Sequence, residues 1–463
     1  MKIIPIKFAY FIWFTFLFSG CISCDSFVEV DLPKSQLTNV TVFEDNATAT
    51  AALTDIYAKI RDKGLLTGLS VGLSNQLGNY SDELIGYSSP STATYNFYHN
   101  ILFATNSTVA DYWNVTYNQI YAANSVIEGA ENSKGLTIEN KKQLQGEAYF
   151  IRALLHFYMV NLFGDIPYIS QTDYSVNKKV SRMPIKKVYE NIVSDLQKSV
   201  EYLPETYTTI QRVRPNKLTA RALLSRVYLY NGSFAEAANE ASALINNAST
   251  FSLTQKIDEV FLIGSKETIW QLQSAIAGQN TREGATFILT STPPSLTSLS
   301  PLLFSSFDVT DLRKSYWIKA VSKGTVTWYH PYKYKERLPT ASSKEYSIVF
   351  RLAEQFLIRA EARAEQKDLI GAKDDLNKIR QRAGLSVTTA ESKEEILSAI
   401  LQERKWEFFT EFGHRFFDLK RSDKIDVVLS PVKSGWNQTD RLFPIPQIER
   451  NVNPNLGAQN AGY

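Results

Sequence analysis

The stretch LTARALLSRVYLYNGSFAEAANEASALIN, residues 218–246, decides the fold class. Apolar and small residues recur every three or four positions on both sides of Gly232 and Ser233, which is the spacing of one face of an α-helix. Glycine is the residue that most often ends a helix. The stretch therefore predicts two helices, residues 219–231 and 234–246, that fold back on each other. The positions expected to face each other are Leu224, Tyr228, Ala238 and Ala241.

A second stretch, FRLAEQFLIRAEARAEQKDLIGAKDDLNKIR (residues 350–380), has the same organisation. Its corresponding positions are Leu357, Glu361, Ala372 and Leu376. Both stretches resemble tetratricopeptide units, although the spacings drift by one residue, and a generic helical hairpin is the alternative for either one alone. Such hairpins cannot bury their apolar faces singly, so we expect them to stack into a scaffold.

Further helices are expected on both sides of these two stretches. Asp45 and Asn46 precede a run with apolar residues every four positions that stops at Gly64. The same criteria predict helices over residues 109–129, 139–162, 184–202, 347–365, 369–383 and 392–412. Between them, residues 65–106 and 249–345 lose the helical period and are rich in Ser, Thr, Pro, Gly and Tyr, and a short strand is expected at residues 325–329.

These patterns predict a mainly α protein with one large domain, residues 43–463. Its tetratricopeptide-like helical pairs are expected to form a scaffold at about residues 107–247 and 347–421. A loop-rich region with a few short strands, at about residues 65–106 and 249–345, is expected to bind the ligand, because long irregular segments in a compact domain usually serve a function.

The N-terminus has the features of an export signal. Two lysines precede the apolar run FAYFIWFTFLF, which is too short for a membrane span, and Ser19-Gly20-Cys21 follows like a lipobox. We predict a lipoprotein signal peptide over residues 1–20, acylation of Cys21 with Cys24 as the alternative, and an extended tether over residues 21–42. A disulfide between the two cysteines is the competing interpretation, although it would only close a short loop in the tether.

Composition and motifs exclude several classes of function. The net charge of +3 lacks the basic excess typical of nucleic-acid binding. The four histidines do not have the spacing of a zinc site, and neither a phosphate-binding loop nor a calcium loop is present, so no cofactor and no metal is predicted. No catalytic motif is found, and we expect a protein that is not an enzyme.

Three long blocks carry a resemblance to a known family. They are LQGEAYFIRALLHFYMVNLFGDIPYI from Leu144, ILQERKWEFFTEFGHRFFDLKRSDKID from Ile400 and LFPIPQIERNVNPNLGAQNAGY from Leu442. In this order and together with CDSFVEVDLPKSQL and YNQIYAANSVI, they resemble the SusD/RagB family over essentially the whole chain. One departure is Phe412, which stands where the family pattern often passes directly from Glu to Gly.

The glutamates of the second block are expected to have a structural role. Glu403, Glu407 and Glu411 are four residues apart on one helix face, and Arg404 and Arg415 are available to pair with them. We interpret the block as a frame of buried ionic bonds, and His414 as a structural histidine.

The resemblance implies a function and a location. SusD-like proteins are lipid-anchored in the outer membrane, face the cell exterior and cover a SusC-like TonB-dependent β-barrel transporter. They bind glycans in many cases and peptides in the RagB branch. The expected partners are therefore this transporter, an oligosaccharide or peptide, and the outer membrane through the lipid anchor.

Aromatic residues next to polar groups in the loop-rich segments are the candidate ligand contacts, because flat rings and hydrogen-bonding groups together suit such ligands. The candidates are Asn79, Tyr80, Asp82, Tyr95, Trp328, Tyr332 and Trp436. For each aromatic residue, burial beneath a loop is the alternative. Two other functions compete with nutrient capture, namely a surface glycan hydrolase and a structural, adhesive helical-repeat protein.

Overall fold

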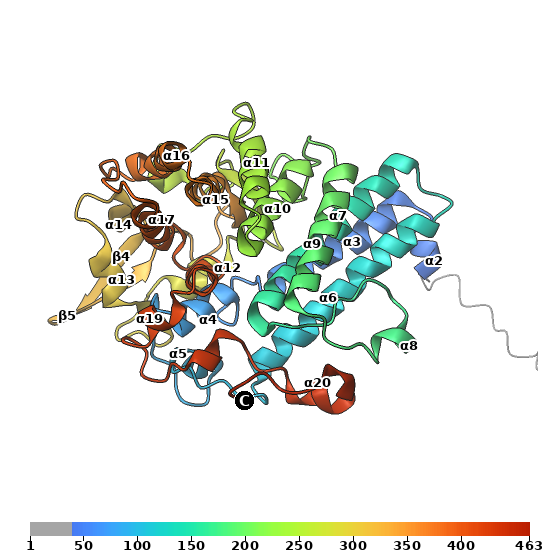
Figure 1. The fold of residues 1–463 in the computed structure, drawn as a ribbon, viewed down its shortest axis with the longest axis horizontal. Helices are drawn as coiled ribbons and strands as arrows, with labels where there is room; N and C mark the ends of the chain where they lie inside the picture. The colour runs from blue at the N-terminus through green and yellow to red at the C-terminus, as the bar shows by residue number, and fades with distance from the viewer. Residues whose placement is uncertain (1–38) are drawn as a thin grey trace, which may run out of the picture.

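The computed structural model describes residues 39–463 (Figure 1). The predicted signal peptide, both cysteines and almost all of the predicted tether lie outside the described residues. The last residues of the tether are not extended but form a short helix, α2 (Asn39–Val42). Within residues 39–463, no helix is both long enough and apolar enough to cross a bilayer.

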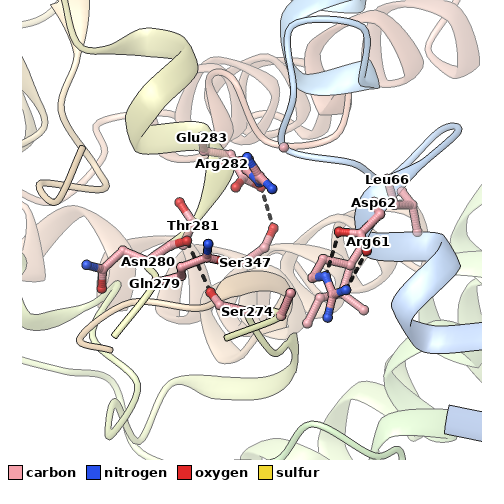
Figure 2. Close-up of a pocket in the computed structure, with 13 residues that line it drawn as sticks. Arg61, Asp62, Leu66, Ser274, Gln279, Asn280, Thr281, Arg282, Glu283 and Ser347 are labelled. Atoms are coloured by element: carbon pink, nitrogen blue, oxygen red, sulfur yellow. Dashed lines mark hydrogen bonds and ion pairs between the residues drawn. The ribbon is translucent and has the colours of Figure 1, made fainter. Parts of the chain in front are cut away.

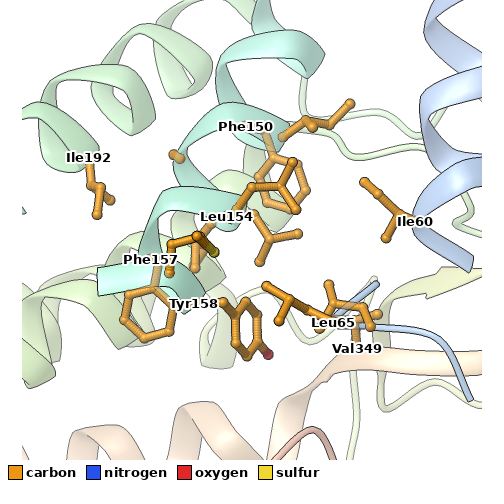
Figure 3. Packing of buried hydrophobic residues seen from close by; sticks show 14 of the residues in the cluster. Ile60, Leu65, Phe150, Leu154, Phe157, Tyr158, Ile192 and Val349 are labelled. Carbon is orange, nitrogen blue, oxygen red and sulfur yellow. The ribbon is translucent and has the colours of Figure 1, made fainter. Parts of the chain in front are cut away.

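Four long helices build the largest part of the core. They are α3 (Asn46–Asp62), α6 (Ser107–Asn132), α7 (Ile138–Phe163) and α9 (Ile185–Tyr202). α7 packs against both α6 and α9 and is buried on nearly every side along its second half. Figure 3 shows side chains of α7 meeting those of α3 and α9, with Phe150, Leu154, Phe157 and Tyr158 between Ile60 and Ile192.

The helix starts follow from local capping. The Asp45 side chain accepts hydrogen bonds from the backbone N–H groups of Ala47 and Thr48 at 2.9 and 3.1 Å. Asn106 and Thr137 cap α6 and α7 in the same way. The predicted helices over residues 109–129, 139–162 and 184–202 are confirmed to within two residues at most ends.

The two predicted helical hairpins are confirmed. They are α10 (Lys217–Asn231) with α11 (Phe234–Ile245), and α15 (Leu352–Glu365) with α16 (Leu369–Arg382). Gly232 ends α10 in the left-handed conformation, with φ of 81°. α11 packs against α15, so the hairpins stack on each other, as Figure 1 shows, and α17 (Lys393–Phe408) extends the stack beside α16.

The strands are short and form three separate antiparallel pairs. β1 (Leu84–Gly86) pairs with β3 (Thr297–Leu299), β2 (Thr268–Leu272) pairs with β6 (Ser347–Arg351), and β4 (Ile318–Lys323) pairs with β5 (Val326–Pro331). β5 confirms the strand expected at residues 325–329, and β3 also contacts β5.

Short helices fill the space around these strands and close the chain. They are α4 (Leu73–Tyr80), α5 (Ala93–Tyr98), α8 (Tyr174–Asn177), η1 (Ile257–Glu259), α12 (Arg282–Phe287), α13 (Pro301–Ser306), α14 (Leu312–Tyr316), α18 (His414–Arg421), α19 (Ile425–Leu429), η2 (Gln438–Arg441), α20 (Gln447–Val452) and η3 (Pro454–Leu456). Figure 1 shows β4, β5, α4, α5, α13, α14 and α19 to the left of the long helices α6, α7 and α9.

Three predicted elements differ from the structure. Residues 347–351, expected to start a helix, form strand β6, because they pair with the buried strand β2. The helix expected over residues 392–412 ends at Phe408, because Thr410 and Phe412 take positive φ values of 55° and 42°. Residues 65–106 are not a continuous loop, since they contain α4, of which every residue is buried.

A network of buried charges joins α17 to α14, α16 and β6. Glu407 accepts hydrogen bonds from Arg313 at 3.0 Å and also from Arg351 and Arg382. Burial opposes the charged carboxylate, but the three guanidinium groups outweigh it and hold the pKa of Glu407 well below its usual value. A frame of arginine and glutamate was therefore predicted correctly.

The predicted partners of that frame were wrong. Arg404 donates to Asp418 at 2.7 Å and Arg415 pairs with Asp82, so neither binds the three glutamates. Arginines and a lysine from outside the block, which sequence spacing could not select, bind them instead. His414 is buried, and burial together with nearby cations holds its pKa well below the usual value, as fits a structural histidine.

Candidate functional site

Tyr80 lies in the core and offers no surface to a ligand. Its side chain is fully buried, and its ring meets the rings of Phe97, Phe416, Trp436 and Phe443 with centroid distances between 5.4 and 5.9 Å. Its hydroxyl donates to the backbone carbonyl of Asp440 at 3.2 Å. These edge-on contacts are those of a core aromatic residue.

Two further candidates belong to the same buried region. The Asn79 amide is fully buried and donates to the carbonyl of Asn75 at 2.8 Å. Trp436 is 8% exposed, and its Nε1 donates to Asp426 at 2.9 Å. The structure thus brings Asn79, Tyr80 and Trp436 together beneath the surface, where they support the loops.

Asp82 is held in a buried ion pair. Arg415 donates to both of its carboxylate oxygens at 2.8 Å. Burial would raise the pKa of Asp82, but the guanidinium charge prevails and the pKa lies below its usual value. The neighbouring Glu83 has no such arginine, and burial followed by the charge of Asp82 raises its pKa to about 8.

Partly exposed aromatic side chains lie around α5 and are here called the α5 aromatic surface, defined by Tyr87, Tyr95, Tyr98 and His99. The Tyr95 and His99 rings lie 4.2 Å apart between centroids, and those of Tyr98 and His99 lie 5.0 Å apart. Tyr87 is 37% exposed, and its hydroxyl is 3.1 Å from that of Ser298 on β3. The rings of Tyr95, Tyr98 and His99 are therefore close together, and Tyr87 is tied to β3.

A lysine from a distant part of the chain holds this surface in place. Lys433 Nζ lies 4.0 Å from the centroid of the Tyr98 ring and donates to the carbonyl of Asn79 at 2.6 Å. Gly86 lies against Tyr98, where an added Cβ would come within 2.9 Å of the Tyr98 Cβ. No pattern in the sequence indicated Lys433, because only the fold brings it to α5.

Trp328 and Tyr332 lie on and just after β5. Trp328 is partly exposed and pairs across the hairpin with Val321 of β4. Tyr332 is partly exposed, with Lys319 Nζ at 3.9 Å from its ring centroid. Because side chains alternate along a strand, Tyr329 points the other way and stacks on Phe304 at 3.5 Å. β3 contacts both β1 and β5 and so connects this hairpin with the α5 aromatic surface.

A small polar pocket lies between α3 and the segment of residues 274–283 (Figure 2). Its volume of about 20 Å³ is that of a single water molecule. Glu283 at its wall is buried, which raises the pKa of the carboxyl, and its Oε2 has no hydrogen-bond partner within residues 39–463. The pocket is too small for a sugar ring or a peptide, and no group of residues in the described part of the chain has the composition of a metal site.

Comparison with known proteins agrees with this architecture. Residues 75–229 match a SusD-like family described as starch-binding and associating with the outer membrane, and residues 309–463 match the SusD family. The SusD-like protein P2 of Formosa agariphila is 29% identical over 98% of this chain and 99% of its own length. The SusD-like protein P25 of the same organism is 25% identical over 97% of this chain and 98% of its own length.

Solved structures share the fold over nearly the whole chain. A SusD superfamily protein from Bacteroides vulgatus has a TM-score of 0.80 at 22% identity, covering 91% of this chain and 100% of that one. A laminarin-binding SusD-like protein has a TM-score of 0.73 at 23% identity, covering 90% and 99%. Two SusD-family matches in chain order, together with relatives that match along nearly their whole length, identify this chain as a member of the SusD/RagB family, and the shared fold agrees with this.

Proposed function

We propose that this protein is a cell-surface lipoprotein that captures an oligosaccharide and passes it to a SusC-like TonB-dependent transporter. Membership of the SusD/RagB family supports the role. Among proteins with the same fold, one is described as laminarin-binding and another, from Bacteroides fluxus, as a surface glycan-binding protein. A peptide in place of the oligosaccharide is the variant of this proposal that the RagB branch suggests.

The observation that carries the proposal is the α5 aromatic surface. Tyr98 lies against Lys433 and Tyr87 against Ser298, so these partly exposed rings are held in place, and the apolar faces of sugar rings stack on exposed aromatic side chains. Because this surface is already ordered, a ligand does not have to order it on binding. Trp328 on the neighbouring hairpin is proposed to extend the same surface.

We propose that the protein acts by binding and has no catalytic activity. Asp82, the acidic candidate nearest in sequence to the α5 aromatic surface, is neutralised by Arg415, and Glu83 and Glu283 are buried. Buried or paired carboxyl groups are poorly placed to protonate a glycosidic bond or to activate water. Relatives described as binding proteins support the same conclusion.

The experiment is equilibrium binding of the purified full chain to laminarin oligosaccharides and to a panel of neutral and acidic glycans and peptides. Trp328→Ala and Tyr98→Ala are expected to weaken binding about tenfold or more, which corresponds to ~1.4 kcal/mol. Helix content by circular dichroism should stay unchanged. Ile370→Ala, which removes a 76% exposed side chain from the scaffold helix α16, is the control and should bind normally.

Two results would contradict the proposal. Unchanged affinity in both aromatic variants would show that this surface does not bind the ligand. Shortening of a glycan during incubation would favour a hydrolase. Co-purification from detergent-solubilised outer membrane tests the transporter, since a TonB-dependent barrel should accompany the protein, whereas an adhesive helical-repeat protein should carry none.

A further inference from the structure

A groove of about 760 Å³ lies away from the α5 aromatic surface and shares no residue with it. One side is α6, the second is the segment of residues 167–180 with α8, and the third is formed by α20 and η3. Figure 1 shows α8 and α20 on the same side of α6. The volume falls within the range of roughly 300–1,000 Å³ that is typical of small-molecule sites.

The α6 side of the groove carries a regular strip of rings and amides. Asn114, Tyr117, Asn118 and Tyr121 follow each other at intervals of three, one and three residues, so they share one helix face. The side-chain amides of Asn114 and Asn118 have no hydrogen-bond partner within residues 39–463. Tyr121 is 46% exposed. Two unused amides beside an exposed ring can donate to and accept from a hydroxyl-rich ligand.

The opposite side of the groove is held rigidly. Asn453 and Asn455 each donate a side-chain hydrogen bond of 2.8 Å, to the carbonyls of Val180 and Lys179. The Tyr117 hydroxyl donates to the carbonyl of Pro167 at 2.8 Å. These bonds join the three sides to one another, so the groove is formed before any ligand arrives.

The rim adds an exposed ring and positive charge. Tyr174 on α8 is 75% exposed, and Lys178 Nζ lies 5.4 Å from its ring centroid. Lys178 and Lys179 are exposed, and Glu449 is the acidic residue among those that line the groove. The two lysines outnumber this one acidic residue, which favours a ligand that carries negative charge close to α8.

We propose that this groove is a second carbohydrate-binding site, for an oligosaccharide with carboxylate or sulfate groups. Tyr121 and Tyr174 would stack on sugar rings, Asn114 and Asn118 would bind hydroxyl groups, and Lys178 and Lys179 would pair with the acidic substituents. The inference rests on the proposed function as a glycan-capturing protein. It adds the class of sugar that is bound and a second site at which the oligosaccharide is held.

The test is calorimetric titration of the full chain with three acidic probes, namely hexamers of alginate and galacturonate and a sulfated carrageenan oligomer, and with laminarihexaose as the neutral probe. At least one acidic probe is expected to bind. Tyr121→Ala and Asn118→Ala should each reduce its affinity about tenfold or more. Both positions lie on the helix surface, where alanine favours the helix, so the variants should fold.

Two further variants separate this site from the α5 aromatic surface and test the charge. Tyr98→Ala should leave the affinity at the groove unchanged. Lys178→Gln should weaken binding of the acidic probe at low salt. It should also reduce the salt dependence of the affinity, because one ionic contact is lost. Binding of laminarihexaose should not respond to the groove variants.

The failures are distinguishable. If no acidic probe binds, or if binding is indifferent to Tyr121→Ala and Asn118→Ala, the second site is refuted. If glycan binding is lost only in Tyr98→Ala, the second site is refuted while the proposed function stands. If no glycan binds in any form, both fail. If the groove variants lose a co-purifying barrel but keep all glycan binding, the groove is a protein contact and the inference is overturned.

Discussion

The ammonium group of Lys433 lies 4.0 Å from the centre of the Tyr98 ring. A buried cation from the C-terminal part of the chain therefore supports an aromatic residue more than three hundred positions earlier in the sequence. The same ammonium donates to the carbonyl of Asn79 at 2.6 Å, which ties the ring to the buried helix α4. Attraction between a cation and an aromatic face contributes about 0.5–2 kcal/mol, and more when water is excluded.

The first prediction concerns this contact and its pH dependence. Lys433→Met keeps the apolar stem and removes the charge, and it should weaken glycan binding at the α5 aromatic surface roughly threefold to tenfold. Burial, opposed by the charge of Asp82, lowers the pKa of Lys433 to about 7. Wild-type affinity should therefore fall as the pH rises from 6 to 8, while the variant should show a flat profile.

The pKa values of three other groups near Lys433 are shifted away from 7. Burial and then Lys433 itself lower the pKa of His99, the pKa of Tyr98 is raised by burial, and that of Asp82 lies below its usual value. Calorimetry at several pH values is the measurement. Identical pH profiles in wild type and variant would show that Lys433 does not position the ring.

The second prediction concerns Glu83 and stability. Its pKa in the folded protein is about 8, raised from 4.5 by burial. A raised pKa means that the folded state binds the proton more tightly, so the stabilisation is complete below pH 4.5 and is lost as the pH rises through 8. Relative to Glu83→Gln, the wild-type free energy of unfolding should fall by about 1.4 kcal/mol per pH unit between pH 5 and 7.

Urea unfolding at a series of pH values checks this expectation. Glu394→Gln changes an exposed glutamate in the first turn of α17 and serves as the control, which should follow the wild type. A Glu83→Gln curve parallel to that of the wild type would mean that Glu83 is ionised in the folded protein.

The third prediction concerns the buried charge network. Glu407→Gln leaves Arg313, Arg351 and Arg382 without their shared carboxylate, and it should lower the free energy of unfolding by about 3–5 kcal/mol. The matched control is Glu336→Gln, which removes a surface ion pair with Lys344 and should cost much less. Equal losses in the two variants, measured by denaturant unfolding, would show that the network contributes no more than a surface pair.

The fourth prediction concerns the lipid anchor. If Cys21 is acylated, Cys21→Ser should abolish incorporation of a labelled fatty acid and release the protein from the membrane fraction. Cys24→Ser should keep both properties. The reverse result would assign the anchor to Cys24, and labelling in both single variants but not in the double variant would mean that either cysteine is accepted. Labelling that survives in the double variant would contradict a cysteine anchor.

The helical scaffold was predictable because its signals are local. Caps such as Asp45, the turn at Gly232 and the three-to-four spacing of apolar residues act within a few positions of the chain. The strand at residues 347–351 was missed because its conformation depends on pairing with β2, which lies about eighty residues away.

The candidate site was only partly predictable. Tyr80 and Trp328 look alike in sequence, as aromatic residues beside polar ones in segments without helical period, yet the first is fully buried and the second is partly exposed. Burial of Tyr80 requires rings from α5, α18 and the C-terminal segment, and Asp82 pairs with an arginine more than three hundred positions later. No local sequence pattern indicates which distant residues come into contact.

The sequence by itself determined the helical hairpins, the family and the choice of irregular segments as the place to look for a ligand, because periodicity, capping and long motifs are properties of neighbouring residues. Only the tertiary structure decided which aromatic side chains face solvent, which cation supports Tyr98 and where the rings and amides on one face of α6 meet the segment that contains α8. The reason is that solvent exposure and charge pairing depend on which distant segments pack together.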